Sequence, residues 1–387
     1  MTHYIDRKIA FYLQRFFRNS ILHYSIIGVY YINCGISKQQ IYYIDAVYWI
    51  ARFLFEFPIG WFSDKSDYRL FLATGTICFS LSYLFISLGQ TITFFCLASI
   101  LAAFAQCFTH SIDTACMFRN IKEVNNYKHF INLEAYGSVS RNLALSISIF
   151  IGGALSIVYP IKNIIIFSAI LVLFSIPFIF MMGNNPSRNK KFSFKDICTR
   201  KLYILFILYS FALSFDYLMY WQLQIMFYDM KLSTYYIGLI FCGILILSAV
   251  FGSVHKIFKT LFCELLVIIC LTMLIVLTQI LSLSMWENVY PLFFFSIILY
   301  AIFRGTYVPL FKAYIAQNSV SNNYASLFSI MNVGGSFFTA LLFFMFGKTI
   351  EIYGIVISLY WYFFAIVFLC LFVIIPNINL LRVNHEY

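Results

Sequence analysis

Long apolar runs separated by short polar stretches extend along nearly the whole chain. Each run is close to the length of about 20 residues that an α-helix needs to cross the hydrocarbon core of a membrane. We therefore predict twelve spanning helices, at roughly residues 9–33, 41–62, 70–89, 92–117, 133–158, 161–182, 202–228, 233–254, 261–285, 289–314, 324–348 and 352–376.

One connection between these helices stands out by its charge and its turn-forming residues. Residues 183–201 read GNNPSRNKKFSFKDICTRK, a composition typical of a linker outside the membrane. This linker divides the chain into two six-helix halves, residues 1–182 and 202–387. In a transporter built from two related halves, the binding site is expected between them near the middle of the bilayer.

The composition supports an all-α membrane protein. Of the 387 residues, 62% are hydrophobic and 11% are charged, which leaves too little polar surface to cover a water-soluble fold. The lipid bilayer is therefore an expected partner of this chain.

The net charge of +11 would suggest a nucleic-acid partner in a soluble protein. In a membrane protein, the positions of lysine and arginine report orientation instead. Placing both termini in the cytoplasm puts most loop cations inside and leaves Lys38, Lys162, Lys231 and Lys348 outside. We predict cytoplasmic termini and no nucleic-acid partner.

The ten cysteines lie mostly within apolar runs and lack the spacing of a metal site or a C-x-x-C motif. They are best interpreted as buried apolar residues. The sequence also lacks a Walker loop and the pattern of a nucleophile triad. We expect no metal, no cofactor, no drive by ATP and no enzymatic activity.

Polar residues are distributed unevenly among the predicted spans. Because ionisable groups are costly in a bilayer, they usually mark the interior of a helix bundle or a wet cavity. Helices three, six, nine and twelve have none over their central parts. Helices one, four, seven and ten carry polar residues at spacings of three or four, which place them on one helical face. These residues are Arg15, Asn19 and His23, then Gln106, His110 and Asp113, then Asp216, Tyr220 and Gln224, and finally Tyr300, Arg304 and Tyr307.

Asp216 and Arg304 are expected at similar depth, near the middle of helices seven and ten. Arg304 is therefore the natural counter-ion of Asp216. The carboxylate could exchange a proton while the arginine changes partner. The alternative is a static ion pair that holds the two helices together.

Three further groups allow both a functional and a structural interpretation. Arg52 and Glu56, four residues apart in the second helix, either neutralise each other or take part in coupling. Asp113 and His110, near the cytoplasmic end of helix four, could accept protons from the cytosol. For His110 and for His23, a buried hydrogen-bonded histidine is the alternative.

A charged hairpin follows the second predicted helix. Residues 49–69 read WIARFLFEFPIGWFSDKSDYR, so the apolar run gives way to charged residues just after Gly60. The spacing of Gly60, Asp64, Lys65 and Arg69 resembles the G-x-x-x-D-(R/K)-x-G-x-(R/K) loop between helices two and three of major facilitator superfamily transporters.

The residues before this loop extend the resemblance. Glu56, Pro58 and Gly60 are similar to the E-x-P-x-G variant of many bacterial members, while Asp67 stands where the family has its second glycine. The resemblance implies two pseudo-symmetric six-helix halves, with helices one, four, seven and ten around a central cavity. It also implies that Gly60 lets helix two approach helix eleven and that Asp64 latches the outward-facing state at that helix's N-terminus. The alternative for the loop is an ordinary solvated turn.

The sequence therefore predicts a secondary transporter that moves a small organic solute by alternating access, as a monomer and with protons as coupling ions. Proton-coupled efflux of a drug-like or amphiphilic compound is our first hypothesis, because the predicted cavity combines aromatic residues with few charges. The fifth helix has Gly152 and Gly153, expected to allow close packing, but lacks the glycine-proline motif of the family's drug antiporters.

Two alternatives remain. The first is proton-coupled uptake of a sugar or other metabolite. The second is a receptor or immunity-type protein that keeps the fold without transport, which the exchange of the family's glycine for Asp67 leaves open. The expected location is the plasma membrane, the inner membrane of a bacterium.

Overall fold

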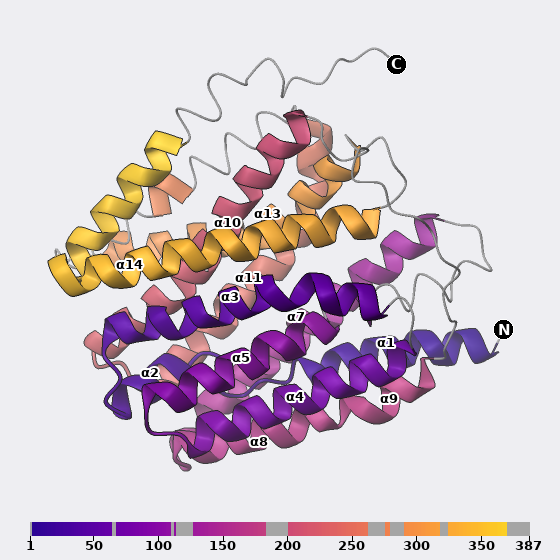
Figure 1. Cartoon of the computed structure of the whole chain (residues 1–387), viewed down its shortest axis with the longest axis horizontal. Helices are drawn as coiled ribbons and strands as arrows, with labels where there is room; N and C mark the ends of the chain where they lie inside the picture. The colour runs from indigo at the N-terminus through magenta and orange to yellow at the C-terminus, as the bar shows by residue number, and fades with distance from the viewer. Residues whose placement is uncertain are drawn as a thin grey trace. The chain divides into compact units, whose positions relative to one another are not determined.

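The structure is a computed structural model, and its described parts are nearly all α-helical (Figure 1). Eight helical stretches in these parts are long and apolar enough to cross a membrane. The predicted multi-pass, all-helical membrane fold is thus confirmed, while the count of twelve spans and the orientation of the termini stay predictions. The described residues are 2–63, 67–109, 112–113, 127–182, 200–261, 275–278, 290–317 and 324–369. Most of the predicted linker and of the ninth span lie outside these ranges.

The chain forms two compact units. Unit 1 contains Met1–Lys191 and Trp221–Gly243, and unit 2 contains Phe192–Tyr220 and Ile244–Tyr387. Each unit is described below by itself.

Unit 1 is built from helices that pack along one another. Helix α4 lies against α5, α8 and α9, α1 packs on α7 and α9, and α3 lies along α5 (Figure 1). A buried apolar cluster, centred on side chains such as Phe11, Tyr68 and Leu72, joins helices α1, α3, α4, α5 and α9 at one end. The helices of this unit are α1 (Thr2–Arg18), α2 (Ile27–Asn33), α3 (Lys38–Ser63), α4 (Tyr68–Leu88), α5 (Ile92–Thr109), α7 (Tyr127–Leu155), α8 (Ile161–Leu173) and α9 (Ser175–Met181).

The first predicted span is interrupted, because α1 ends at Arg18 and α2 begins at Ile27. The side-chain amide of Asn19 donates to the carbonyl of Arg15 at 2.7 Å, and the hydroxyl of the following serine bonds the next carbonyl along the helix. Two polar side chains thereby bond carbonyls of the last turn of α1. The prediction that Arg15, Asn19 and His23 share one helical face is therefore wrong, since the helix ends before His23.

The interrupted segment packs closely between two helices of unit 1. The backbone N–H of Leu22 donates to the hydroxyl of Ser168 in α8 at 3.0 Å. On the other side, the carbonyl of Leu22 occupies the space that a Cβ at Gly152 in α7 would fill. The neighbouring Gly153 similarly allows close contact with Gly238 of α11. Both glycines thus serve the close packing that the sequence predicts.

Unit 2 contains the amino-terminal part of α10 (Arg200–Asp229), the later part of α11 (Thr234–Leu261), α13 (Tyr290–Gln317) and α14 (Tyr324–Leu369). The hydroxyl of Ser248 in α11 donates to a carbonyl of α13 at 2.9 Å. Hydroxyls of Ser214 in α10 and Thr339 in α14 lie 2.9 Å apart. Such contacts between polar side chains stabilise helix packing within a bilayer.

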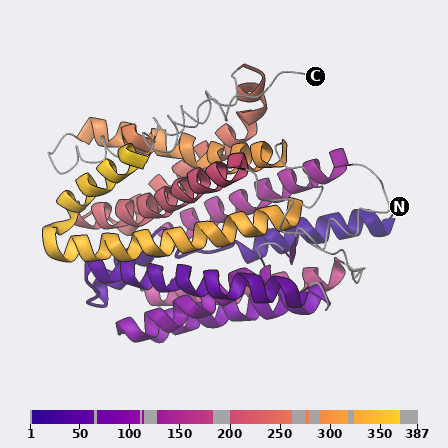
Figure 2. The same ribbon diagram turned by 45° about the horizontal axis from the view of Figure 1, so that its top comes forward.

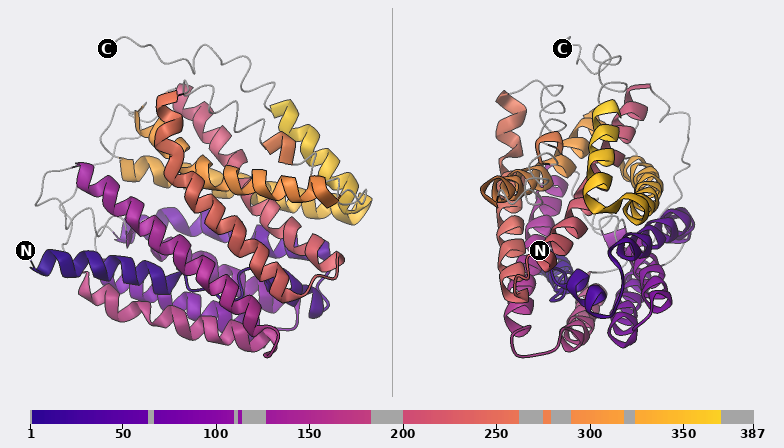
Figure 3. Two further views of the ribbon diagram at one scale, coloured as in Figure 1. Left: turned by 180° about the vertical axis from the view of Figure 1, so that it is seen from behind. Right: turned by 90° about the vertical axis from the view of Figure 1, so that its left-hand side faces the viewer.

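Helix α14 combines the last two predicted spans. It is 46 residues long and bends at Gly354, whose φ of 80° lies in the left-handed region that favours glycine. Figures 2 and 3 show its yellow carboxy-terminal part turning away from its orange part at this bend.

The contact of Gly152 with the interrupted segment gives a test of the packing. We expect Gly152→Ala to destabilise the protein by about 1–3 kcal/mol, because the added methyl group overlaps backbone rather than a flexible side chain. The matched control is Gly243→Ala in α11, where a Cβ meets nothing within 4 Å. Thermal unfolding midpoints of the detergent-purified variants check this, and equal midpoints for both would contradict the described packing.

Candidate functional site

Asp216 is a buried carboxylate of unit 2, and α10 places it against one face of α13. Tyr300 and Tyr307 lie on this face, two helical turns apart. The hydroxyl of Tyr300 donates to Oδ1 of Asp216 at 2.9 Å, and the hydroxyl of Tyr307 donates to Oδ2 at 3.2 Å. Asp216 is only 7% exposed. Both of its carboxylate oxygens therefore accept hydrogen bonds from tyrosines of a single neighbouring helix.

Arg304 joins this group through a tyrosine. Its Nη1 donates to the hydroxyl of Tyr300 at 2.9 Å and lies 3.7 Å from Oδ1 of Asp216. The structure thus brings Arg304 and Asp216 together, as their predicted depths suggested. The arginine is linked to the carboxylate mainly through a neutral hydroxyl instead of a bidentate ion pair.

Aromatic rings surround the Asp216 group within unit 2. The ring of Phe303 stacks on that of Tyr307 with centroids 4.9 Å apart, and Phe215 meets Phe303 edge-on at 5.1 Å. Tyr209 adds a third ring 6.3 Å from Tyr307. These rings pack on Tyr307, which bonds Asp216, or on its neighbour Phe303.

The other two predicted residues of helix seven have different positions. Tyr220 is buried in the part of α10 that belongs to unit 2. Gln224 belongs to unit 1, where its side-chain oxygen accepts a 2.7 Å hydrogen bond from the backbone N–H of Gly28. That N–H lies in the first turn of α2, where no carbonyl of the same helix is available to it. Gln224 therefore supports the start of α2.

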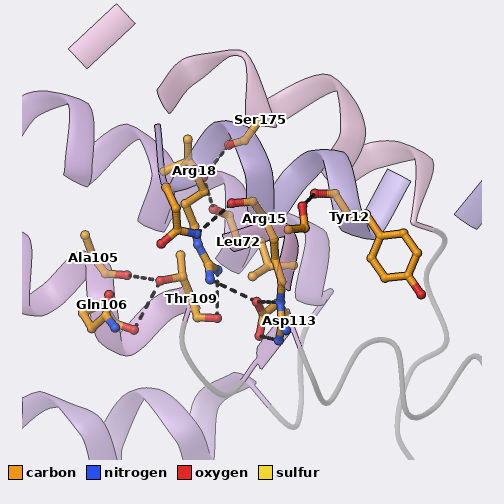
Figure 4. A network of polar contacts seen from close by, with 12 residues as sticks. Tyr12, Arg15, Arg18, Leu72, Ala105, Gln106, Thr109, Asp113 and Ser175 are labelled. Carbon is orange, nitrogen blue, oxygen red and sulfur yellow. Dashed lines mark hydrogen bonds and ion pairs between the residues drawn. The ribbon is translucent and has the colours of Figure 1, made fainter. Parts of the chain in front are cut away.

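Another charged group, in unit 1, centres on Asp113 (Figure 4). Asp113 is 0% exposed. Nε of Arg15 and Nη2 of Arg18 lie 3.0 and 3.1 Å from the same oxygen of Asp113. Arg18 also donates to the carbonyl of Thr109 at 3.3 Å. Because two guanidinium groups share this carboxylate, Asp113 anchors α1 to the end of α5 in this structure.

Two of three further polar residues predicted for helices one and four are described by the structure. Gln106 is half-buried in α5, one turn before Thr109. His110 lies outside the described residues. His23 lies in the interrupted segment, where its Nδ1 is 2.9 Å from the hydroxyl of Ser168 and its ring meets Tyr83 edge-on at 4.7 Å. The geometry of His23 matches the alternative of a buried hydrogen-bonded histidine.

A charged stripe follows one side of α3. Nε of Arg52 lies 3.2 Å from Oε2 of Glu56, and the guanidinium lies over the ring of Trp49 at 5.2 Å from the centroid. The indole N–H of Trp49 donates in turn to Oδ2 of Asp45 at 3.0 Å. Sequence reasoning selected Arg52 and Glu56 but missed Asp45. Its spacing of four from Trp49 and of seven from Arg52 was the available signal.

In the loop before α4, Asp67 has a structural role of its own. Its carboxylate accepts a 2.9 Å bond from the backbone N–H of Arg69 and a 2.8 Å bond from the Arg69 side chain. Asp67 thereby caps α4. Its φ of −71° requires no glycine. Hydrogen bonds from the Arg69 side chain hold the pKa of Asp67 below its ordinary value.

Of the remaining motif residues, Gly60 lies within the described part of the chain. The backbone of Gly60 is helical within α3. Asp64 and Lys65 lie outside the described residues. The latch that the family resemblance implies for Asp64 therefore stays a prediction.

The cap at Asp67 predicts a pH-dependent contribution to stability. We expect Asp67→Ala to lower the free energy of unfolding by about 1 kcal/mol and Asp67→Asn, which keeps a capping oxygen, by less. Because the folded-state pKa is depressed, the charge contribution is present above the ordinary carboxylate pKa of about 3.9 and is lost as the pH falls through the folded value. Unfolding midpoints measured from about pH 7 to about pH 3 should show the Asn variant converging on the unsubstituted protein. A constant difference would contradict this.

The group at Asp113 predicts a larger effect. We expect Asp113→Asn to cost about 3–5 kcal/mol, since it removes the carboxylate that two buried arginines share. The control is Asp229→Asn, which removes a half-exposed ion pair with Lys38 of 2.7 Å and should cost about 0–1 kcal/mol. Unfolding midpoints and the yield of monodisperse protein compare the two. Equal losses would show that Asp113 does not anchor the arginines.

Comparisons with known proteins agree with this architecture. The sequence profile of the Major Facilitator Superfamily matches residues 10–287. Among solved structures, the nucleoside transporter NupG is similar with 14% identity, 97% of this chain and 98% of that chain covered, and a TM-score of 0.73. A POT family transporter in complex with a thioalcohol-conjugated peptide has 12% identity, coverage of 98% and 95%, and a TM-score of 0.75. The D-xylose-proton symporter has 12% identity, coverage of 96% and 96%, and a TM-score of 0.70.

The search of curated proteins gave no match. The family profile nevertheless covers more than half of the chain, and the similar structures share its fold over nearly their whole lengths. The chain belongs to the Major Facilitator Superfamily and has the fold of its transporters.

Proposed function

We propose that this chain is a secondary transporter of the plasma membrane that moves a small organic solute by alternating access and couples this movement to protons at Asp216. The observation that carries the proposal is the setting of this carboxylate. It is buried, both of its oxygens accept tyrosine hydroxyls, and its cation stands 3.7 Å away across one of those hydroxyls. A buried carboxylate in a membrane protein is a functional candidate by default.

The geometry suggests how a proton would act. When Asp216 is charged, it attracts Arg304 and accepts strong bonds from Tyr300 and Tyr307. When it is protonated, this attraction is lost, while the bond from Arg304 to Tyr300 can remain. The contact between α10 and α13 therefore differs in free energy between the two protonation states. Such a difference is what a proton needs in order to shift a conformational equilibrium.

The solute that we propose is an amphiphilic compound, and the proposed direction is export. Support comes from the rings of Tyr209, Phe215, Phe303 and Tyr307, which give the Asp216 group an apolar surrounding. The named solutes of the similar structures are nucleosides, a peptide conjugate and xylose. These solute classes are candidates under the alternative of proton-coupled uptake, and they are included in the binding screen described next.

Transport in everted membrane vesicles tests the proposal. A thermal-shift screen of amphiphilic compounds, nucleosides, peptides and sugars first identifies a solute. With the vesicle interior acidified, export by proton antiport should accumulate this solute inside, whereas uptake by proton symport should expel it. We expect Asp216→Asn to reduce gradient-driven solute accumulation about 5- to 150-fold, the range of factors that corresponds to typical coupling free energies. The variant should retain solute exchange without a gradient.

The control for this experiment is Glu351→Gln, which neutralises an exposed carboxylate of α14 in the same unit. It should leave gradient-driven transport unchanged. Gradient-driven transport that is unaltered in Asp216→Asn would refute coupling at this residue. Absence of any transport, together with tight solute binding, would favour the receptor alternative.

A further inference from the structure

Asp45 is a carboxylate in the second predicted span that accepts a hydrogen bond from an indole. Trp49 donates to its Oδ2 at 3.0 Å. Trp221 adds a second indole interaction that falls short of a well-formed hydrogen bond. In the described part of the chain, no lysine, arginine or histidine forms an ion pair with Asp45. Asp45 thus differs from Asp113 and Asp216, which both have an arginine nearby.

The cations of unit 1 closest to Asp45 along α3 are engaged elsewhere. Arg52 is paired with Glu56 at 3.2 Å, and Lys38 is paired with Asp229 at 2.7 Å. When Asp45 is ionised, the stripe of Asp45, Arg52 and Glu56 on α3 therefore carries one more negative than positive charge. A charge without a counter-ion is costly within a bilayer, so a cation from outside the protein would be favoured there.

Aromatic side chains of unit 1 lie around this carboxylate. The ring of Tyr31 stacks on that of Trp221, with centroids 6.0 Å apart and planes 19° from parallel. Trp49 and Tyr42 lie one turn to either side of Asp45 on α3 and are fully buried. Asp45 itself is only partly covered by protein. Aromatic faces attract cations, and tryptophan does so most strongly.

One of these rings already holds a cation in this structure. The guanidinium of Arg52 lies over the face of Trp49 at 5.2 Å from the centroid. The indole N–H on the edge of the same ring is bonded to Asp45. The combination of π faces with one carboxylate is the chemistry that recognises ammonium groups and other organic cations.

We infer that Asp45, together with Trp49, Trp221 and Tyr31, binds the positively charged group of an organic cation. The inference rests on the proposed transport function and names the class of solute. Asp216 is less suited to this task, because both of its oxygens accept tyrosine hydroxyls and Arg304 lies nearby. The two carboxylates therefore have different roles: Asp45 binds the solute and Asp216 binds the proton.

Two probes of equal shape and opposite charge test this site. Tetraphenylphosphonium and tetraphenylborate are titrated against the purified full-length protein in lipid nanodiscs, and binding is followed by calorimetry and by tryptophan fluorescence. We expect the phosphonium to bind at least about tenfold more tightly than the borate. Asp45→Asn should weaken phosphonium binding by about tenfold or more, and Asp45→Glu should restore part of it.

Matched variants serve as controls. Asp6→Asn neutralises an exposed carboxylate of α1 and should leave phosphonium affinity unchanged. Trp221→Leu should weaken phosphonium binding about fivefold by removing a π face without changing charge, whereas Trp361→Leu, at an exposed position of α14, should not. The tryptophan pair decides the question even if Asp45→Asn does not fold.

The outcomes distinguish this inference from the proposed function. Asp216→Asn should lose proton-driven transport and keep phosphonium binding. Equal affinity of the unsubstituted protein for the two probes would overturn the inference. Phosphonium affinity that is unchanged in both Asp45→Asn and Trp221→Leu would also overturn it, because a carboxylate–indole bond that only stabilises α3 predicts that result.

Discussion

The cost of placing a charge among apolar helices governs this structure. Each buried ionic group must be offset by a neighbouring side chain, and the way in which it is offset determines what the group can do. Asp113 is held by two guanidiniums and acts as an anchor. Asp216 is held by two hydroxyls with one guanidinium behind them. Asp45 accepts its well-formed hydrogen bond, among the described residues, from the indole of Trp49.

This series of three carboxylates separates directly paired charge from indirectly compensated charge. A group that is fully compensated by direct ion pairs gains little from a proton or a ligand. A group whose charge is compensated indirectly, like that of Asp216, gains more free energy from an added proton. The reason is that protonation does not remove the partner of an arginine bound through two direct bonds. The same reasoning sets Arg52 and Glu56 apart, since their direct pair of 3.2 Å neutralises both within one helix.

Much of the architecture was predictable because lipid imposes a simple rule on sequence. Apolar runs gave the spanning helices, and the periodic placement of Tyr300, Arg304 and Tyr307 predicted the polar face that meets Asp216. The end of α1 was not predictable from hydrophobicity, because it depends on the Asn19 side chain bonding the backbone. Asp45 was not predicted as a site residue because its hydrogen-bond donor is the indole N–H of a tryptophan, a residue that counts as apolar.

The interruption between α1 and α2 has a mechanical consequence. A continuous helix behaves as a stiff rod and transmits a tilt along its whole length, whereas a segment without the regular backbone ladder bends at low cost. The arginine-bearing α1 can therefore change its tilt independently of α2, whose first turn is bonded to the Gln224 amide. The pivot point of this tilt is the peptide of Leu22, which packs against Gly152 and is hydrogen-bonded to the Ser168 hydroxyl.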